Sequence, residues 1–240
     1  MTAGVFITGT DTGVGKTWIG AALAHLLTQG GRRVRPRKPL ESGCVPGPDG
    51  LHPQDAAALR EAAGSLEPLD RVCPYRLEAP LSPDRAAALA GISLDLERLT
   101  QACRAGVEDG DFLLVEGAGG FCSPLTADHL NADLAVALQL PVLLVTADRL
   151  GAIHQVLVTV EAIERRGLRL AGVVLNQVVP GPDPRMDNAA DLASRLGREV
   201  IVGVPHGQTQ GTAQPRHGTA FSLTGLADRL AADIHGRPWA

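Results

Sequence analysis

The residues with the clearest chemistry lie near the N-terminus, in the run TGTDTGVGKT at residues 8–17. This run follows a short apolar segment and precedes a helical pattern, so we expect a strand that turns through small residues into a helix. The backbone N–H groups of such a turn bind phosphate. Lys16 then supplies a positive charge to the β- and γ-phosphate oxygens, and the hydroxyl of Thr17 suits Mg²⁺. The run therefore predicts a nucleoside triphosphate site.

The predicted phosphate loop differs in one respect from the strict pattern, which places glycine at position 10. Thr10 stands there, so the first glycine is either lost or moved one residue earlier, to Gly9. A small-residue turn that binds no ligand is the alternative. Gly13 and Gly15, which allow the backbone to approach phosphate closely, favour the phosphate site.

A carboxylate also stands at the end of a predicted strand. Glu116 follows the apolar run at residues 112–115 and precedes the small residues GAGG. An acidic residue there needs a positive partner, and Mg²⁺ on nucleotide phosphates would provide one. Capping of a nearby helix and pairing with an arginine are the alternatives. Asp55 opens a predicted helix, where capping is favoured over metal binding on spacing alone.

A lysine ends the second predicted strand. Pro39 turns the chain away from helical geometry directly after Lys38, which could reach phosphates or a substrate carboxylate from this point. We interpret the neighbouring arginines as a solvated, alternating face rather than a binding patch. These arginines are Arg32, Arg33, Arg35 and Arg37.

Short apolar runs alternate with helical patterns along the chain, which is typical of strand–helix–strand units in a parallel sheet. The predicted strands are Val5–Thr8, Val34–Lys38, Phe112–Glu116, Val142–Thr146, Gly172–Asn176 and Val200–Val204. The predicted helices are Lys16–Gln29, Asp55–Ala63, Leu94–Gly106, Ile153–Arg166, Asp187–Leu196 and Leu223–His235. Because the apolar runs do not alternate with polar residues, we expect helices on both faces of the sheet. In such sheets, ligands bind outside the carboxyl ends of the strands.

The predicted fold class is therefore α/β, with a mostly parallel, doubly wound sheet and helices on both faces. We expect residues 1–240 to form a single domain. Segments rich in proline and glycine predict loops at residues 42–53, 180–184 and 207–218.

The composition is that of an ordinary globular protein, with 45% hydrophobic and 20% charged residues. A net charge of −4 gives no basic field that would attract nucleic acid or an anionic membrane. The four cysteines form no C-x-x-C pair, so we expect reduced thiols in a cytoplasmic protein. The chain begins directly with the first predicted strand and has no long apolar run, so we predict neither secretion nor membrane insertion.

Further motifs extend over nearly the whole chain. They are GTDTGVGKT at residues 9–17, KPLESG at 38–43, Asp55, PY at 74–75, PLSP at 80–83, VEGAGG at 115–120, LGAI at 150–153 and Asn176. The phosphate loop alone is generic, whereas the KPxxSG and VEGAGG segments together are much more selective. With these motifs the chain resembles the dethiobiotin synthetase family, the ATP-dependent ligases of biotin synthesis.

The resemblance implies a three-layer P-loop fold, a homodimer, and a reaction that joins CO₂ to 7,8-diaminononanoate (7,8-diaminopelargonate) with ATP and Mg²⁺. One amine forms a carbamate, and the γ-phosphoryl group converts it to a mixed carbamic–phosphoric anhydride. The second amine then closes the ureido ring and releases phosphate. The implied partners are these small molecules and a second copy of the chain.

The resemblance also implies roles for individual residues. Lys16 and Lys38 are the implied catalytic cations, which neutralise charge on the carbamate and on the transferring phosphoryl group. The implied Mg²⁺ ligands are Thr17, Asp55 and Glu116, and at Asp55 the family motif outweighs helix capping. The implied nucleotide-binding residues are Thr12, Gly13, Val14, Gly15, Lys16, Thr17, Asp55, Glu116, Asn176, which would read the adenine edge, and Pro205. The implied substrate-binding residues are Thr12, Ser42 and, in the turn contributed by the second copy, Gly151, Ala152, Ile153 and His154.

Three residues depart from the pattern of the family. His154 stands where a polar amide is usual, Asp84 stands where histidine is common, and Asn188 or a neighbour replaces a tyrosine that is often found there. His154 can still donate a hydrogen bond to a carboxylate, with a pH dependence that an amide would lack. The sequence leaves the choice among ATP, CTP and other nucleotides open.

The main alternative is a ParA/MinD-like ATPase, a nucleotide-dependent switch. Those proteins resemble the phosphate loop but carry a lysine where Asp11 stands. The predicted C-terminal helix is also not basic, because it holds Asp228 and Asp233 with a single Arg229. A further alternative, the ATP-binding half of an amidotransferase-type ligase, would need a glutaminase domain for which 240 residues leave no room.

Overall fold

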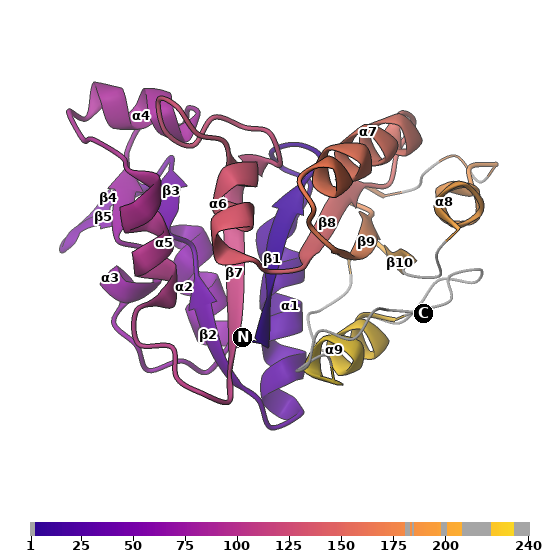
Figure 1. Cartoon of the computed structure of the whole chain (residues 1–240), viewed down its shortest axis with the longest axis horizontal. Helices are drawn as coiled ribbons and strands as arrows, with labels where there is room; N and C mark the ends of the chain where they lie inside the picture. The colour runs from indigo at the N-terminus through magenta and orange to yellow at the C-terminus, as the bar shows by residue number, and fades with distance from the viewer. Residues whose placement is uncertain (1–2, 181–182, 184, 198–200, 208–221, 233–240) are drawn as a thin grey trace.

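A computed structural model describes residues 3–180, 183, 185–197, 201–207 and 222–232. Its centre is a sheet of six parallel strands in the order β10-β9-β8-β1-β7-β2 (Figure 1). The strands of this sheet are β1 Ala3–Gly9, β2 Arg33–Arg37, β7 Asp111–Gly120, β8 Val142–Ala147, β9 Leu170–Asn176 and β10 Ile201–Val204. All six predicted strands are present. Val200, which was predicted to open the last strand, lies outside the described residues.

Helices cover both faces of the sheet, as the unbroken apolar runs predict (Figure 1). On one face lie α1 Lys16–Gln29, α2 Gln54–Ala62 and α9 Leu223–Ala232. On the other lie α5 Leu96–Arg104, α6 Asn131–Leu138, α7 Ala152–Arg165 and α8 Asn188–Leu196. The six predicted helices agree with α1, α2, α5, α7, α8 and α9 to within two residues at the described ends, and residues 233–235 lie outside the described part.

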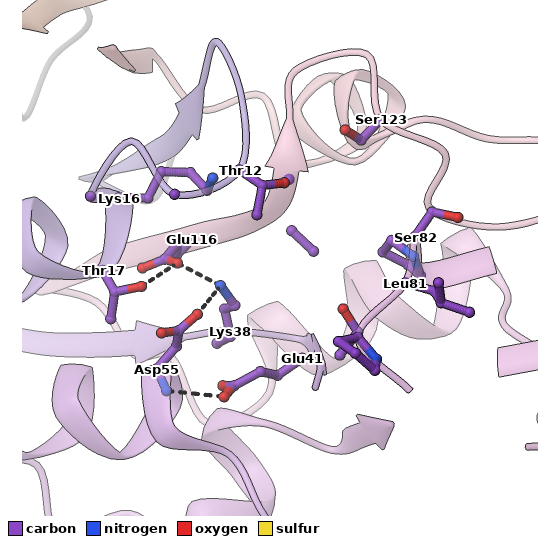
Figure 2. Close-up of a pocket in the computed structure, with 17 residues that line it drawn as sticks. Thr12, Lys16, Thr17, Lys38, Glu41, Asp55, Leu81, Ser82, Glu116 and Ser123 are labelled. Atoms are coloured by element: carbon purple, nitrogen blue, oxygen red, sulfur yellow. Dashed lines mark hydrogen bonds and ion pairs between the residues drawn. The ribbon is translucent and has the colours of Figure 1, made fainter. Parts of the chain in front are cut away.

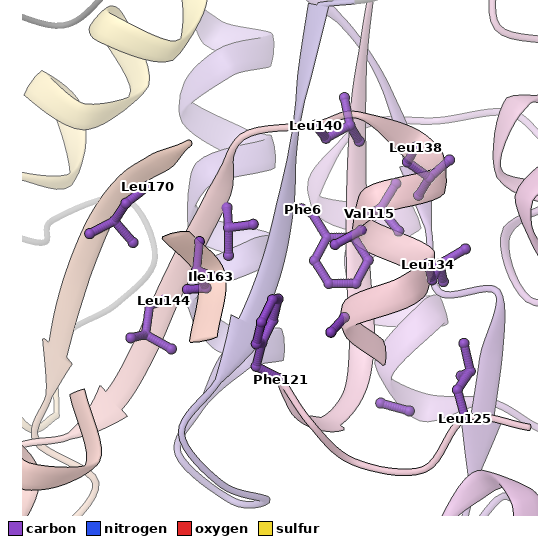
Figure 3. Close-up of a cluster of buried hydrophobic side chains, with 14 of the residues drawn as sticks. Phe6, Val115, Phe121, Leu125, Leu134, Leu138, Leu140, Leu144, Ile163 and Leu170 are labelled. Atoms are coloured by element: carbon purple, nitrogen blue, oxygen red, sulfur yellow. The ribbon is translucent and has the colours of Figure 1, made fainter. Parts of the chain in front are cut away.

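Each face of the sheet has its own apolar core, because successive strand residues point in opposite directions. Val5 and Ile7 of β1 pack with α1 and α9, whereas Phe6 between them packs with the side chains of α6 and α7. Figure 3 shows this second core around Phe6 and Phe121. The two cores together confirm the doubly wound α/β class.

The predicted loop at residues 42–53 is wrong in part, because it contains an antiparallel hairpin. The strands β4 Val45–Gly47 and β5 Gly50–His52 pair there, while β3 Leu40–Ser42 pairs in parallel with β6 Tyr75–Leu77. Pro46 is tolerated in so short a pair because each strand has a free edge. The predicted loops at 180–184 and 207–218 lie largely outside the described residues.

Three helices were not predicted, namely α3 Leu69–Val72, α4 Pro83–Leu89 and α6. In α6 the apolar residues run on almost without a break into β8, so no helical period separates the two elements. The helices α3 and α4 are only 4 and 7 residues long.

The interpretation of the arginines beside β2 as a solvated face holds for Arg33, which is exposed, but is wrong for Arg37. Arg37 is completely buried, and its guanidinium binds both carboxylate oxygens of Glu67 at 2.8 and 3.0 Å. Arg33 and Arg35 bind the carboxylate of Asp111, whose side chain is also buried. The edge strand β2 is therefore covered by ion pairs whose acidic partners lie far away in the sequence, at positions that periodicity does not reveal.

Candidate active site

The strand order brings the separate motifs to one edge of the sheet. β7 lies between β1 and β2, with Glu116 opposite Ile7 and with Val115 opposite Arg37. Because all three strands are parallel, the phosphate loop, Lys38 and Glu116 emerge at the same carboxyl edge. This is the edge at which ligands bind in open α/β sheets.

A cavity of about 560 Å³ opens at this edge (Figure 2). The predicted site residues that line it are Thr12, Gly13, Gly15, Lys16, Thr17, Lys38, Ser42, Asp55 and Glu116. Residues without a predicted role also line it, namely Glu41, Pro80, Leu81, Ser82, Pro83, Ala118, Gly119 and Ser123. The cavity thus extends from the phosphate loop to the segment that carries Ser82, which leaves room for a second molecule beside a nucleotide.

Four side chains at the floor of the cavity form one connected charge cluster (Figure 2). The Nζ of Lys38 lies 2.5 Å from Oε1 of Glu116 and 2.9 Å from Oδ2 of Asp55. The hydroxyl of Thr17 donates to the same Glu116 oxygen at 2.9 Å. Lys38 and Glu116 are buried, so their contact is shielded from bulk water, while the side chain of Asp55 is 41% exposed at the edge of the cluster.

The two acidic partners determine the charge state of the lysine. Burial alone would lower the pKa of Lys38, but the carboxylates of Glu116 and Asp55 raise that pKa above its ordinary value. Burial likewise opposes ionisation of Asp55, yet the Lys38 ammonium lowers the pKa of Asp55 below its usual value. The alternative that Asp55 caps a helix is therefore wrong. Pro53 holds the capping position of α2, and the carboxylate of Asp55 instead binds Lys38.

Lys16 lies across the cavity from this cluster, and its Nζ donates to the backbone oxygen of Asp11 at 2.9 Å. The Asp11 carboxylate accepts a hydrogen bond from the N–H of Thr12 at 2.7 Å. Asp11 stands at the position where ParA/MinD-like proteins carry a lysine, so this chain has an acidic side chain there. Burial, and next the neighbouring charge of Lys38, lower the pKa of Lys16 to about 8.

This lowered pKa predicts proton uptake when phosphate binds. Above about pH 8 much of Lys16 is neutral in the free protein, and a phosphate anion beside it favours the charged form, which raises its pKa. We expect nucleotide binding at about pH 8.5 to take up a proton and to weaken as the pH rises further. Calorimetric titration in two buffers of different ionisation enthalpy measures the uptake. Lys16→Arg keeps the charge without titrating in this range, so equal uptake by this variant would contradict the assignment.

The end of β9 lies against the phosphate loop. The Nδ2 of Asn176 donates to the backbone oxygen of Val14 at 3.0 Å. Gly15 has a φ of 91°, and a Cβ atom there would lie 2.2 Å from the same Nδ2, so only glycine fits. Asn176 and Val14 are buried and are not part of the cavity lining, and neither is Pro205, which directly follows β10.

The predicted turn at residues 151–154 does not line this cavity. Gly151 precedes α7 in a left-handed conformation, and Ala152 is the first residue of that helix. His154 is exposed, and Leu150 beside the turn is 89% exposed. Within one copy of the chain, these residues are therefore not brought together with Lys16 and Lys38.

Two of the positions that depart from the family pattern lie in the first turns of helices. The Nδ2 of Asn188 donates to the carboxylate of Asp148 at 2.8 Å, which fixes the start of α8 to the end of β8. Asp84 lies in the first turn of α4, directly after Pro83 in the cavity wall.

Glu41 is a site residue that the sequence reasoning missed. Its two carboxylate oxygens accept from the backbone N–H groups of Asp55 and Ala56, each at 3.0 Å. The capping residue Pro53 offers no side-chain acceptor, and Glu41, which lies in the strand β3, caps α2 in its place. It lies within the KPLESG motif, but nothing in local spacing connects it to a helix 14 residues later.

We expect Glu41→Ala to lower the free energy of unfolding by about 1–3 kcal/mol, because two N–H groups at the helix start lose their acceptor. Urea denaturation measures this change. Glu61→Ala is the matched control, since Glu61 is exposed in the last turn of the same helix. Equal losses in the two variants would mean that Glu41 does not act through the cap.

The residues at the cavity floor fit a divalent cation that also binds phosphate. They offer two carboxylates and a hydroxyl, which are the hard oxygen ligands that Mg²⁺ prefers. The Oε2 of Glu116 is buried and has no hydrogen-bond partner within the described chain. Over the same residues, no cluster of three or more His, Cys, Asp and Glu side chains could hold a metal by itself. A metal here would therefore take further ligands from phosphate and water.

Comparison with known proteins gives the family. A family model described as an AAA domain matches residues 3–213. A curated protein of Anaeromyxobacter dehalogenans, named ATP-dependent dethiobiotin synthetase BioD, is 47% identical over 203 residues, which cover 84% of this chain and 89% of that protein. The chain belongs to the dethiobiotin synthetase family. Another member of this family, from Xanthomonas campestris, is 39% identical over 87% of this chain and 95% of its own length.

Membership of the dethiobiotin synthetase family confirms the resemblance and the prediction that the chain is an enzyme of the ligase class. Among solved structures, the septum site-determining protein MinD with Mg-ADP from Pyrococcus horikoshii matches with a TM-score of 0.51 at 18% identity, covering 96% of each chain. A likeness at this identity shows the shared P-loop fold alone. Within the described residues, no helix is both long and apolar enough to cross a membrane.

Proposed function

We propose that this chain joins CO₂ to 7,8-diaminononanoate with the use of ATP, forming dethiobiotin, ADP and phosphate. The observation that carries the proposal is the cavity that holds Lys16, Lys38, Asp55 and Glu116 at one end and continues to Ser82 at the other. It offers cations for a phosphoryl group and space for a second substrate, and relatives of nearly the same length carry the name of this ligase.

We assign the phosphates, the diamine and the adenine base to different groups of residues. The N–H groups of Gly13, Val14 and Gly15 bind the phosphates, and Lys16 compensates the charge of the transferring phosphoryl group. Thr12 and Ser42 contact the diamine and its carbamate, while Asn176 reads the adenine edge. Pro205 completes the base site from the end of β10.

Lys38 faces the carbamate oxygen that attacks the γ-phosphoryl group. It stabilises the negative charge that develops there and in the mixed anhydride, in a site shielded from water. Thr17, Asp55 and Glu116 would hold Mg²⁺, which supplies charge neutralisation for the phosphates when it is bound. The second amine then closes the ureido ring with release of phosphate.

The proposal includes a cytoplasmic homodimer in which residues 1–240 form one catalytic domain. The turn Gly151-Ala152-Ile153-His154 of one copy binds the substrate carboxylate in the cavity of the other. The start of α7 suits this role, because the first N–H groups of a helix and its dipole favour an anion. The exposure of Gly151 and His154, and the absence of the turn from the cavity of its own chain, support donation to a partner.

Phosphate release by the purified protein with ATP, Mg²⁺ and bicarbonate tests the proposal, with and without 7,8-diaminononanoate, while mass spectrometry follows the ring product. Phosphate release that depends on the diamine and yields the ureido product is expected. ATP turnover that does not depend on the diamine would instead favour a switch ATPase or another acceptor. Exchange of ATP for CTP in the same assay measures the nucleotide preference.

A further inference from the structure

The cavity floor already contains a cation. The ammonium of Lys38 lies between the carboxylates of Asp55 and Glu116, two of the three side chains assigned to Mg²⁺ (Figure 2). Its side chain is 4% exposed and that of Glu116 is fully buried, so bulk water does not compete for the contact between them, whereas the side chain of Asp55 is 41% exposed. The lysine and the metal are thus directed to the same two carboxylates.

The hydrogen bonds at Glu116 leave no free position on Oε1, so both cations cannot use that oxygen at once, whereas Oε2 has no hydrogen-bond partner within the described chain. Its Oε1 accepts from Lys38 at 2.5 Å and from the hydroxyl of Thr17 at 2.9 Å, which uses both lone pairs of that oxygen. A metal bound through this oxygen would have to replace one donor. Lys38 is the donor that leaves, because its positive charge repels a metal bound at either oxygen of this carboxylate, whereas the hydroxyl of Thr17 can be a ligand.

We propose that Lys38 occupies the metal site of the nucleotide-free protein as a substitute cation, and that arrival of Mg²⁺ with the nucleotide displaces its ammonium into the cavity. This inference rests on the proposed function only for the identity of the metal ligands. In the free protein the lysine holds the buried carboxylate of Glu116 and the partly exposed carboxylate of Asp55 together without a metal. After displacement, the same lysine faces the reacting groups, so the catalytic cation becomes available only when the metal–nucleotide complex is in place.

The composition of the chain fits this double use. Of its 22 basic residues only Lys16 and Lys38 are lysines, and both line this cavity. A lysine carries a compact ammonium on a flexible stem, which can change partners, whereas the planar guanidinium of arginine suits the fixed pairs seen at Arg37. The small number of lysines also makes the displacement directly observable.

Nuclear magnetic resonance of the lysine ammonium groups in the full-length protein tests the displacement without any turnover. With ¹⁵N-lysine labelling, only two side-chain signals arise, and Lys16→Met assigns them. We expect the Lys38 signal of the free protein to shift strongly with Mg²⁺ and ADP, and to shift much less with ADP and a chelator. No shift in either case, or an equal shift in both, would overturn the proposal.

Metal binding in the absence of nucleotide gives a second test. We expect Lys38→Met to bind Mn²⁺ at least tenfold more tightly than the wild type, as followed by electron paramagnetic resonance, because the competing cation is gone. Lys16→Met is the matched control and should change Mn²⁺ affinity by less than threefold, while adding Glu116→Gln to Lys38→Met should remove the gain. Equal Mn²⁺ affinities of Lys38→Met and wild type would overturn the proposal.

The two tests do not depend on each other or on the identity of the substrate. The resonance experiment uses the wild-type side chain at position 38, so it does not depend on whether Lys38→Met folds. Neither test uses the diamine or bicarbonate. A wrong substrate assignment would therefore leave both results unchanged, and only the phosphate-release assay would detect it.

Discussion

Replacement of Lys38 by alanine is expected to lower kcat by about 10²–10³-fold, which corresponds to about 3–4 kcal/mol of lost transition-state stabilisation. The expected loss is large because the ammonium is buried and acts on charge that develops during phosphoryl transfer. In a site shielded from water, no solvent molecule replaces it at the same strength. Steady-state assays of diamine-dependent phosphate release at saturating substrates measure kcat.

A suitable control for Lys38→Ala is Arg98→Ala, which removes an exposed cation on α5 and should leave kcat within twofold of the wild type. Circular dichroism and thermal unfolding of both variants show whether the fold is kept, since Asp55 and Glu116 lose a partner in Lys38→Ala. A folded Lys38→Ala protein with a kcat within threefold of the wild type would exclude the lysine from the chemistry.

Replacement of Arg37 by alanine is expected to have the largest effect on stability, with a loss of about 3–5 kcal/mol in the free energy of unfolding. The guanidinium makes two bonds to Glu67 and three to the backbone oxygens of Pro36, Cys103 and Ala105. Its removal leaves the buried carboxylate of Glu67 with only the longer contact to Arg35 at 3.7 Å, and takes the Arg37 donor from the carbonyl groups of Pro36 and Cys103. Since domains are stable by only about 5–15 kcal/mol, this is a large share of the total.

Urea denaturation measures the effect of Arg37→Ala, with Arg165→Ala as the matched control. Arg165 forms an exposed pair with Glu161 on α7, and such a pair contributes about 0.3–0.5 kcal/mol. A loss below 1 kcal/mol in Arg37→Ala would show that water replaces the missing donors. Kinetic constants of the folded variant should stay near those of the wild type, because Arg37 does not line the cavity.

Site residues could be predicted from the sequence where they lie close together along the chain or directly follow a strand. Gly15, Lys16 and Thr17 lie in one short turn, and Glu116 directly follows an apolar strand, so residue type and spacing predicted where they would meet. Strands such as β7 and β8 could also be predicted, because they are buried on both faces of the sheet and therefore have unbroken apolar runs.

What the sequence did not reveal depends on contacts between distant segments. Glu41 caps a helix from another strand, and Arg37 finds its partner 30 residues later, so neither pattern has a periodic signature. The burial of Arg37 contradicts the simple reading that charges near a strand are solvated. The helix α6 was missed because its apolar residues merge with those of β8, so that no change of period marks the boundary.

The position of β7 between β1 and β2 has a consequence for the order in which the molecule can form during synthesis. The two strands flanking β7 lie within the first 37 residues, but β7 itself begins only at Asp111. Until that strand emerges, β1 and β2 have no partner between them, and their open edges can pair with other chains. The growing polypeptide should therefore depend on chaperones until the middle of the chain is made, and fragments that end before Asp111 should aggregate.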